Sequence, residues 1–390
     1  MTQPNEQSTT NSRPACAGAV LDILRAMAVP GLGPIGIRRL IETFGCWDNI
    51  VGAPVEALRE QGIRADAIRA IRSATRTFDP EAEYDKAQVL GIAMVPFTAE
   101  VYPQALKVQP GSPPLLFVRG RLLERDAVAI GIVGTRRASL YGRMQAERLA
   151  FELASAGFTV VSGLARGIDA AAHRAALKAG GRTLAVLGNG LASVYPPEHA
   201  KLAEEIAANG ALLCELLPET APSAANFPPR NRLIAGLSLG VVVVEAGRRS
   251  GALITAREAG EMGKEVFAVP GDVTRPQTRG SHQLIRDGAK LVEAVNDILE
   301  ELGPLTQPVR LDTERTPLAD PRAMTLNRNE RHIYDILDTT PQDIDTITRE
   351  SRLSPANVAS TLMVLELKHL AVQIPGKRYV RGGTFEREPG

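Results

Sequence analysis

Residues 128–177 read VAIGIVGTRRASLYGRMQAERLAFELASAGFTVVSGLARGIDAAAHRAAL, and this stretch decides the fold class. The apolar, β-branched run over 128–133 predicts a buried strand. A turn at 134–137 leads into a helix that Gly157 ends, and residues 158–161 form a second strand before a second helix. A strand, a helix and another strand in succession form a parallel sheet through a right-handed crossover. The stretch therefore predicts an α/β domain.

The same alternation of strands and helices continues downstream. Strands that are apolar throughout, separated by helices, are typical of a sheet covered on both faces. We predict a Rossmann-like, doubly wound, mostly parallel sheet. Its further strands are expected at 91–95, 115–118, 183–187, 211–214, 240–244 and 266–269, and its further helices at 198–209, 230–237 and 253–262.

The composition is that of an ordinary globular protein with two or three domains. The chain has 390 residues, a net charge of +1, 44% hydrophobic and 4% aromatic residues. No window approaches the ~18 to 20 apolar residues of a membrane span, and the polar N-terminus lacks the pattern of a signal peptide. The three cysteines are widely spaced, and no HExxH or CxxC motif occurs. We therefore expect a cytoplasmic protein with reduced thiols, no membrane contact and no metal.

Two smaller domains are expected beside the sheet. The N-terminal one is helical, and its Gly31-Leu-Gly33 turn before a basic helix is typical of a helix-hairpin-helix, whose turn binds a nucleic-acid phosphate. A SAM-like packing domain explains the same pattern equally well. The predicted organisation is a disordered tail at 1–17, this helical domain at 18–78, the Rossmann-like domain at 79–302, a linker at 303–322 and a winged helix at 323–385.

The C-terminal pattern of three helices and a β-hairpin predicts the winged helix. Its expected recognition helix offers Asn357, Ser360 and Thr361 but no basic residue before Lys368. A specific DNA reader normally carries a basic footprint, so we favour a protein-contact or regulatory role. Weak phosphate contacts stay open for three basic residues of the wing, Lys377, Arg378 and Arg381.

Arginines and small residues follow several of the predicted strands. In doubly wound sheets the ligand lies beyond the carboxyl ends of the strands, where helix N-termini present free N–H groups. Arginines at several such ends indicate a polyanion site; a surface that is merely rich in arginine is the alternative. The candidate DNA-binding residues are Gly134, Thr135, Arg136, Ser139, Gly163, Arg166, Phe227, Arg230, Asn231, Arg232, Ser250 and Gly251.

The segment Phe227-Pro-Pro-Arg-Asn-Arg232 combines an aromatic ring with two arginines. We interpret it as an extended loop that stacks a base and grips phosphates. A phenylalanine that caps the core, with solvated arginines, is the alternative.

Several other functions are not supported by the motifs. The first turn reads Gly131-Ile-Val-Gly134 without the GxGxxG spacing, and Ser162-Gly163 stands where an acid would hold a ribose, so NAD is not expected. No P-loop motif is present. Asp169 and His173 stand four residues apart on one helix, but without a GxSxG elbow we interpret them as structural.

These strings together resemble the DNA-processing protein A family, DprA, also called Smf. The resemblance spans roughly residues 102–302, and the flanking helical and winged-helix domains also suit the family. The matching strings are Ile132-Val-Gly-Thr-Arg136 with Ser139, Tyr141 and Gly142; Ser162-Gly-Leu-Ala-Arg-Gly-Ile-Asp169 with His173; Tyr195-Pro196; 227–237; Glu245-Ala246; 250–255; and Val269-Pro-Gly271.

The resemblance implies a non-enzymatic cytoplasmic protein that binds single-stranded DNA without a cofactor. Such proteins are homodimers, here expected through the Rossmann-like domain, and they load a RecA-type recombinase onto incoming DNA in natural transformation. The family's DNA pocket maps onto Gly134, Thr135, Arg136, Ser139 and the segment 227–232.

The alternative from a different class is a hydrolase. The architecture also resembles the lysine-decarboxylase-like enzymes that cleave nucleoside monophosphates over a Pro-Gly-Gly loop. At the corresponding strand end this chain reads Glu245-Ala-Gly-Arg-Arg-Ser-Gly251, and Pro-Gly-Gly-x-Gly-Thr does not occur.

Overall fold

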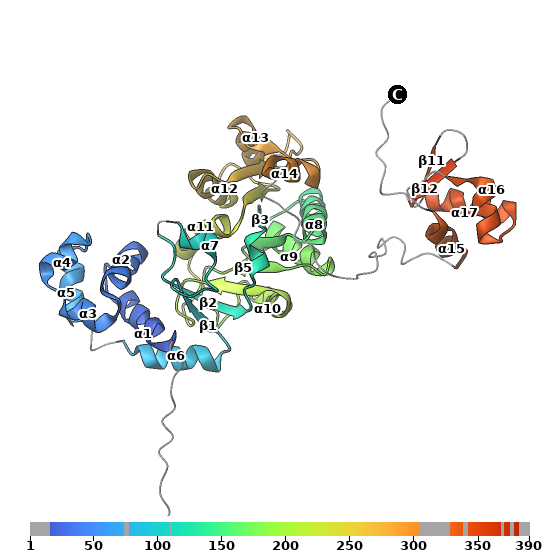
Figure 1. The fold of residues 1–390 in the computed structure, drawn as a ribbon. Helices are drawn as coiled ribbons and strands as arrows, with labels where there is room; N and C mark the ends of the chain where they lie inside the picture. The colour runs from blue at the N-terminus through green and yellow to red at the C-terminus, as the bar shows by residue number, and fades with distance from the viewer. Residues whose placement is uncertain are drawn as a thin grey trace, which may run out of the picture. The chain divides into compact units, whose positions relative to one another are not determined.

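A mostly parallel sheet lies at the centre of the first of two compact units, Met1–Arg310 and Leu311–Gly390 (Figure 1). The computed structural model describes residues 16–73, 78–109, 111–303, 328–337, 342–367, 370–374 and 378–381. Within these residues the sheet has nine strands, in the order β1 (Ala93–Pro96), β2 (Leu115–Gly120), β6 (Ala211–Cys214), β5 (Thr183–Val186), β4 (Thr159–Ser162), β3 (Ala129–Val133), β7 (Gly240–Val243), β8 (Glu265–Ala268) and β9 (Lys290–Leu291).

The strand order confirms the predicted doubly wound fold. Neighbouring strands from β6 to β9 are parallel, whereas β2 is antiparallel to both β1 and β6. From β3 the chain proceeds outward through β4, β5 and β6, and then returns to β7 on the other side of β3. The carboxyl ends of β3 and β7 therefore form the topological switch point, where such sheets bind ligands.

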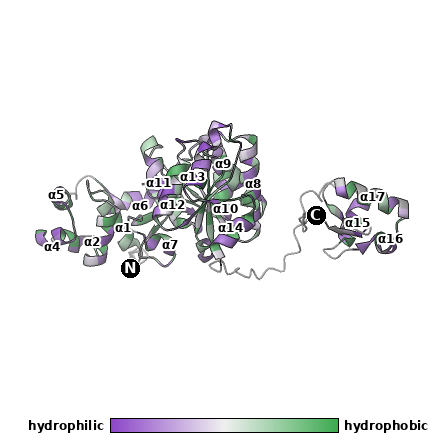
Figure 2. Ribbon diagram, turned by 90° about the horizontal axis from the view of Figure 1, so that it is seen from above, coloured by the Kyte–Doolittle hydropathy of each residue, from purple (hydrophilic) through white to green (hydrophobic). Residues whose placement is uncertain are grey.

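Helices cover both faces of the sheet. Side chains of α8 (Leu140–Ser155), α9 (Ile168–Lys178) and α14 (Val295–Leu302) share one core cluster with Ile130 and Ile132. Side chains of α10 (Ala200–Asn209), α11 (Phe227–Leu237) and α12 (Ala252–Glu261) share the other core cluster with Val133. Helix α13 (Arg279–Arg286) follows β8 in the chain. The covering helices carry both hydrophobic and hydrophilic residues (Figure 2), as amphipathic helices do when one stripe faces a core.

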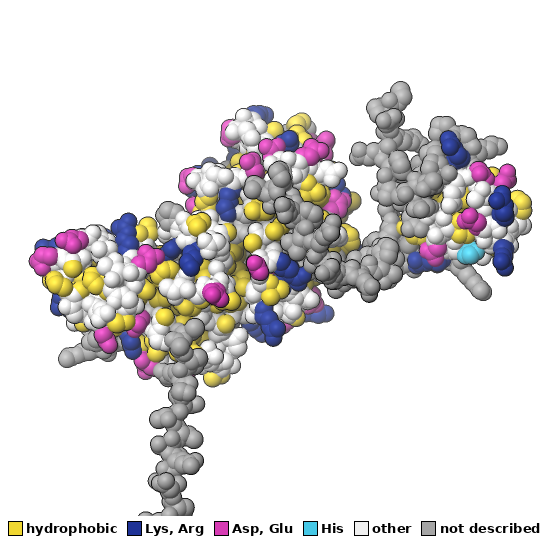
Figure 3. Space-filling view, viewed as in Figure 1, with side chains coloured by type: hydrophobic (Ala, Val, Ile, Leu, Met, Phe, Trp, Pro, Cys, Tyr) yellow, Lys and Arg dark blue, Asp and Glu magenta, His cyan; other side chains and the backbone are white. Residues whose placement is uncertain are grey.

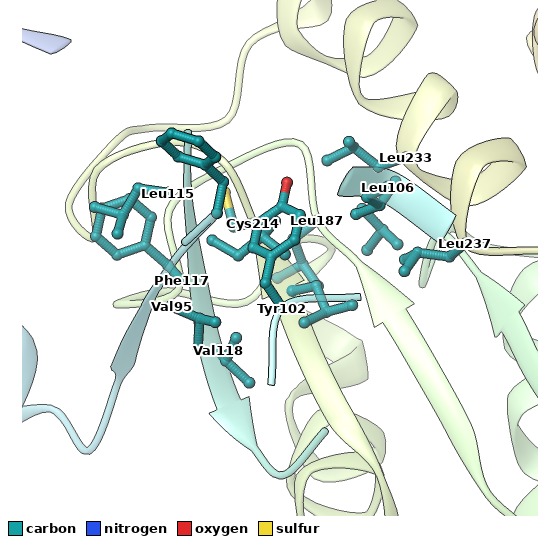
Figure 4. Packing of buried hydrophobic residues seen from close by; sticks show 14 of the residues in the cluster. Val95, Tyr102, Leu106, Leu115, Phe117, Val118, Leu187, Cys214, Leu233 and Leu237 are labelled. Carbon is teal, nitrogen blue, oxygen red and sulfur yellow. The ribbon is translucent and has the colours of Figure 1, made fainter. Parts of the chain in front are cut away.

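Helix α11 is held from the side by the segment between β1 and β2. In Figure 4, Leu106 of the short helix α7 (Gln104–Lys107) lies beside Leu233 and Leu237 of α11. A Cβ atom at Gly236 would lie 2.6 Å from Leu106 Cδ2, so the glycine permits this close contact. The packing fixes the axis of α11, and thereby the position of its first turn.

The N-terminal helices belong to the same compact unit as the sheet. They are α1 (Cys16–Met27), α2 (Pro34–Phe44), α3 (Trp47–Gly52), α4 (Val55–Glu60), α5 (Ala65–Ser73) and α6 (Pro80–Val89). Gly31 in the turn before α2 has φ +79°, which favours glycine. Arg38 of α2 donates hydrogen bonds to the main-chain oxygens of Lys107 and Gln109 and lies over the Phe97 ring. This arginine ties α2 to the sheet region.

The second unit has the winged-helix fold that the sequence predicts. Its elements are α15 (Arg328–Ile336), β10 (Gln342–Asp343), α16 (Ile344–Ser351), α17 (Pro355–Leu367), β11 (Ala371–Ile374) and β12 (Arg378–Arg381). Ile333, Ile347 and Leu362 are fully buried in a core of its own. The Asp343 side chain caps α16 by accepting from the Thr346 N–H. The predicted linker from 304 onward, residues 1–15 of the predicted tail and Lys377 lie outside the described residues.

One local prediction is wrong. Phe227, Pro228 and Pro229 were expected in an extended loop, but they form the first turn of α11. Proline is favoured in the first turn of a helix because its missing N–H has no partner there in any case. The two prolines therefore begin the helix instead of preventing it.

Candidate functional site

A cavity of about 830 Å³ opens at the carboxyl ends of β3 and β7, at the switch point of the sheet. Its walls come from the turn after β3, the first turns of α11 and α12, and the short helix η5 (Pro276–Thr278). The structure brings eight of the twelve candidate residues together in its lining: Gly134, Thr135, Arg136, Phe227, Arg230, Asn231, Ser250 and Gly251.

An arginine and two aromatic rings are stacked at this cavity. The guanidinium carbon of Arg136 lies 5.0 Å from the centroid of the Phe227 ring. The rings of Phe227 and Tyr195 have centroids 5.9 Å apart and an interplanar angle of 37°. A Cβ atom at Gly188 would lie 2.7 Å from Phe227 Cδ1, so the glycine makes room for the ring. The stack places a cation and two π faces side by side, as a binding site for bases and phosphates requires.

The cavity is electropositive on a charge-balanced surface. Arg136, Arg137, Arg230 and Arg249 line it, against the single carboxylate of Asp169. Within the described residues Arg136, Arg137 and Arg249 are exposed and form no ion pair. Elsewhere, basic and acidic side chains are interspersed on the face shown in Figure 3, consistent with the net charge of +1. Attraction for a polyanion is therefore local to the cavity.

Small residues allow the turn after β3 to lie close to the start of α9. Gly167 has φ +78°, and a Cβ atom there would lie 2.3 Å from the main-chain oxygen of Thr135. At Gly134 a Cβ atom would lie 2.4 Å from Ile168 Cγ1. These two glycines are therefore required for the position of Arg136.

Arg230 forms part of the floor of the cavity but is only 5% exposed. Its Nη1 donates to the main-chain oxygens of Gly163, at 2.9 Å, and Val186. Burial lowers the pKa of Arg230 to about 10, opposed by the nearby carboxylate of Asp169. Asp169 accepts hydrogen bonds from the N–H groups of Gly163 and Ala165, and burial raises its pKa. Arg230 and Asp169 are thus the buried part of the cavity lining, and Arg136, Arg137 and Arg249 are its exposed arginines.

Four candidate residues do not line the cavity. Ser139 is the N-cap of α8, where its Oγ accepts from the Gly142 N–H at 3.0 Å. Gly163 lies behind the Arg230 guanidinium, which a Cβ atom at this position would contact at 2.6 Å. Arg166 is ion-paired with Glu198, and Arg232 with Glu215.

Other lining residues were not among the twelve candidates. They include Arg137, Tyr195, Ser223, Arg249, Thr255 and Gln277. Arg137 and Arg249 follow the same strands as candidate residues, and Tyr195 and Thr255 lie in strings that resemble the family. Gln277 reaches the cavity only because the loop after β8 folds back, and no local pattern indicates this.

Two features are absent from the described part of the chain. Among the described residues, no group of three or more His, Cys, Asp or Glu side chains is placed to hold a metal ion. No helix in this part of the chain is long and apolar enough to span a membrane.

Comparison with known proteins gives a consistent family. Residues 93–303 match the family model described as DNA recombination-mediator protein A, and residues 317–377 match the DprA winged helix domain. Protein Smf of Synechocystis is 34% identical over 384 residues, which cover 90% of this chain and 96% of that protein. Protein Smf of Escherichia coli is 47% identical over 210 residues, which cover 54% of this chain and 56% of that protein.

A solved structure agrees with these sequence relatives. The X-ray structure of DNA processing protein A from Streptococcus pneumoniae superposes with a TM-score of 0.63 and 35% identity. The match covers 72% of this chain and 97% of that one.

Proposed function

The chain belongs to the DprA/Smf family of DNA-processing proteins, and on that premise we propose that it binds single-stranded DNA through the cavity at the ends of β3 and β7. The observation that carries the proposal is the stack of Arg136, Phe227 and Tyr195 beside Arg137 and Arg249, two more exposed arginines that form no ion pair with any described residue. Arginines bind phosphates whatever the base, and aromatic faces stack any base. Such a site is expected to be tolerant of sequence.

We expect a preference for single strands because stacking needs an unpaired base. Binding of fluorescein-labelled 20-mers, single-stranded and duplex, is measured by anisotropy over a range of salt concentrations. The single strand should bind more tightly at every salt concentration, and affinity should fall with salt as counterions are released. Equal affinity for the blunt duplex would refute the proposal.

We propose that the chain is not an enzyme. In the cavity the available carboxylate is Asp169, which is 5% exposed and already accepts two main-chain N–H groups. A hydrolase that cleaves a glycosidic bond needs a carboxylate that reaches its substrate. Incubation with nucleoside monophosphates should release no free base, and release of base would favour the hydrolase alternative.

Recombinase loading during natural transformation, homodimerisation through the Rossmann-like domain and a cytoplasmic location complete the proposal. Family membership supports all three. The direct test of loading is the rate at which a RecA-type recombinase forms filaments on DNA that is already coated with a single-strand-binding protein. We expect this chain to increase that rate, and sedimentation velocity should give the mass of a dimer.

A further inference from the structure

Glu245, just after β7, contacts both ends of the turn that carries Arg136. Its main-chain oxygen accepts a hydrogen bond from the Thr135 N–H at 2.7 Å. Its side-chain Oε2 accepts another from the Ser139 N–H at 2.8 Å. Arg136 lies between these two anchors, and Glu245 itself is only 2% exposed. One buried residue therefore fixes the turn from which Arg136 reaches the cavity.

The carboxylate of Glu245 lies over the first turn of α8. A Cβ atom at Gly142 would be 2.3 Å from Oε2 and 3.1 Å from Cδ of Glu245. The first turn of a helix presents unsatisfied N–H groups and the positive end of the dipole. In doubly wound sheets, the turn after the first strand is where this end binds a phosphate. Here the chain's own carboxylate fills that position.

We infer that Glu245 is a positioning residue, a built-in anion that fixes the Arg136 turn and excludes phosphate from the α8 N-terminus. The phosphates of a bound strand are then held on the other side of the turn, by Arg136 and the exposed arginines of the cavity. The inference rests on the proposed function and names the residue that directs phosphate within the same site. It also explains why the turn lacks the GxGxxG spacing, since no pyrophosphate approaches its backbone there.

A double-mutant cycle in the full-length chain tests whether Glu245 acts through Arg136. Glu245→Ala should weaken binding of a labelled dT 20-mer about tenfold, the effect of losing one positioned charged contact. In an Arg136→Ala background the same change should weaken binding less than about twofold, because contacts that act as a unit are not additive. Effects that multiply would overturn the inference.

Adding a small carboxylate to the Glu245→Ala variant distinguishes a positioning role of Glu245 from a merely structural one. Glu245→Ala opens space for a small carboxylate, so acetate should return most of the lost DNA affinity. At the same ionic strength, chloride should not. Asp126→Ala is the matched control, because Asp126 is also buried and is ion-paired with Arg182 at 2.7 Å. It adjoins the start of β4, the opposite edge of the sheet from the cavity. This control should lose stability without any acetate-dependent change in DNA affinity.

Melting temperatures measured without DNA test this inference separately from the proposed function. Inorganic phosphate should raise the melting temperature of Glu245→Ala and leave that of the wild type unchanged at equal ionic strength. Equal stabilisation of both proteins would overturn the inference that the Glu245 carboxylate occupies the anion position at the α8 N-terminus. A wild-type chain that binds no oligonucleotide would overturn the proposed function alone. If Glu245→Ala does not fold, Glu245→Gln keeps the volume and an acceptor for Ser139 but removes the charge. It should weaken DNA binding less in the Arg136→Ala background than in the wild type, and a loss of equal size in both backgrounds, or no loss in the wild type, overturns the inference that Glu245 acts as a built-in anion.

Discussion

Arg136 and Arg232 look equivalent in the sequence, but the structure places them in different surroundings. Arg136 is exposed in the cavity, whereas Arg232 is ion-paired with Glu215 and does not line it. Arg136→Ala should weaken oligonucleotide binding and lower the slope of log affinity against log salt by about 0.7, one phosphate's share on a single strand. Arg232→Ala should leave that slope unchanged and lower the melting temperature, because it removes the ion-pair partner of the half-buried Glu215 carboxylate. Salt titrations of both variants, with melts, check this; the reverse pattern would contradict it.

Phe227 contributes through stacking, which depends little on salt. Its ring is a neighbour of both the Arg136 guanidinium and the Tyr195 ring at the cavity. Phe227→Ala should weaken binding by roughly 1 to 3 kcal/mol, the usual cost of one stacked base, with an unchanged salt slope. Phe227→Trp should retain most of the affinity. Anisotropy titrations at three salt concentrations measure both quantities, and a loss that disappears at high salt would assign Phe227 an electrostatic role instead.

His173 makes the folded chain sensitive to acid. The Thr183 hydroxyl donates to the Val160 main-chain oxygen and so accepts from His173 Nδ1–H at 2.6 Å. Nε2 is buried and has no hydrogen-bond partner among the residues that the structure describes. Burial lowers the pKa of His173 from 6.5 to about 3. Between these values the unfolded chain binds the proton and the folded chain does not, so stability is lost as pH falls through this window.

His173→Asn should remove this contribution, since an amide can still donate to Thr183 but does not titrate. The free energy of unfolding should then depend less steeply on pH between about 6 and 4, by up to about 1.4 kcal/mol per pH unit. Urea titrations at several pH values measure the slope. Parallel curves for the variant and the wild type would contradict the assignment.

At the scale of elements, the first turn of α11 contributes residues to the cavity, and its last turn is held by hydrogen bonds from Lys264. Lys264 Nζ donates to the main-chain oxygens of Gly236 and Ser238, at 2.6 and 2.5 Å, where the helix ends. Lys264→Met should lower the free energy of unfolding by about 1.5 to 3 kcal/mol, because the lysine ammonium no longer donates to these two carbonyls. DNA affinity of the folded variant should be unchanged, because Lys264 does not line the cavity. Lys201→Met, on the exposed face of α10, is the control and should change the melting temperature little.

The elements also show what sequence patterns can and cannot predict. The strands were predictable because a sheet covered on both faces needs apolar runs, and the cavity because parallel strands end at one edge. The first turn of α11 was not predicted. Two consecutive prolines are compatible both with an extended loop and with the first turn of a helix, and the sequence alone does not show where the helix begins. The ion pair of Arg232 was not predicted, because Glu215 lies 17 residues earlier in the chain and the two side chains meet only in the folded structure.

At the scale of the whole molecule, the two compact units have separate cores. A fragment of residues 16–303 should therefore remain folded and bind single-stranded DNA within about threefold of the full chain, since all cavity residues lie within it. Circular dichroism and anisotropy of the fragment check this. A folded fragment that no longer binds would make the winged helix a primary DNA contact.

The pairing of β3 with β7 has a consequence for when DNA binding is gained during folding. Ile130 pairs with Gly240, about 110 residues further along the chain, so the central strands meet only after a long loop has closed. Pairings of such high contact order form slowly, whereas helices form in about a microsecond. The turn after β3 and the helices before and after β7 enclose the cavity. A refolding chain should therefore regain its helical signal before it regains DNA affinity, and a nascent chain should bind DNA only after the residues of β7 have been synthesised.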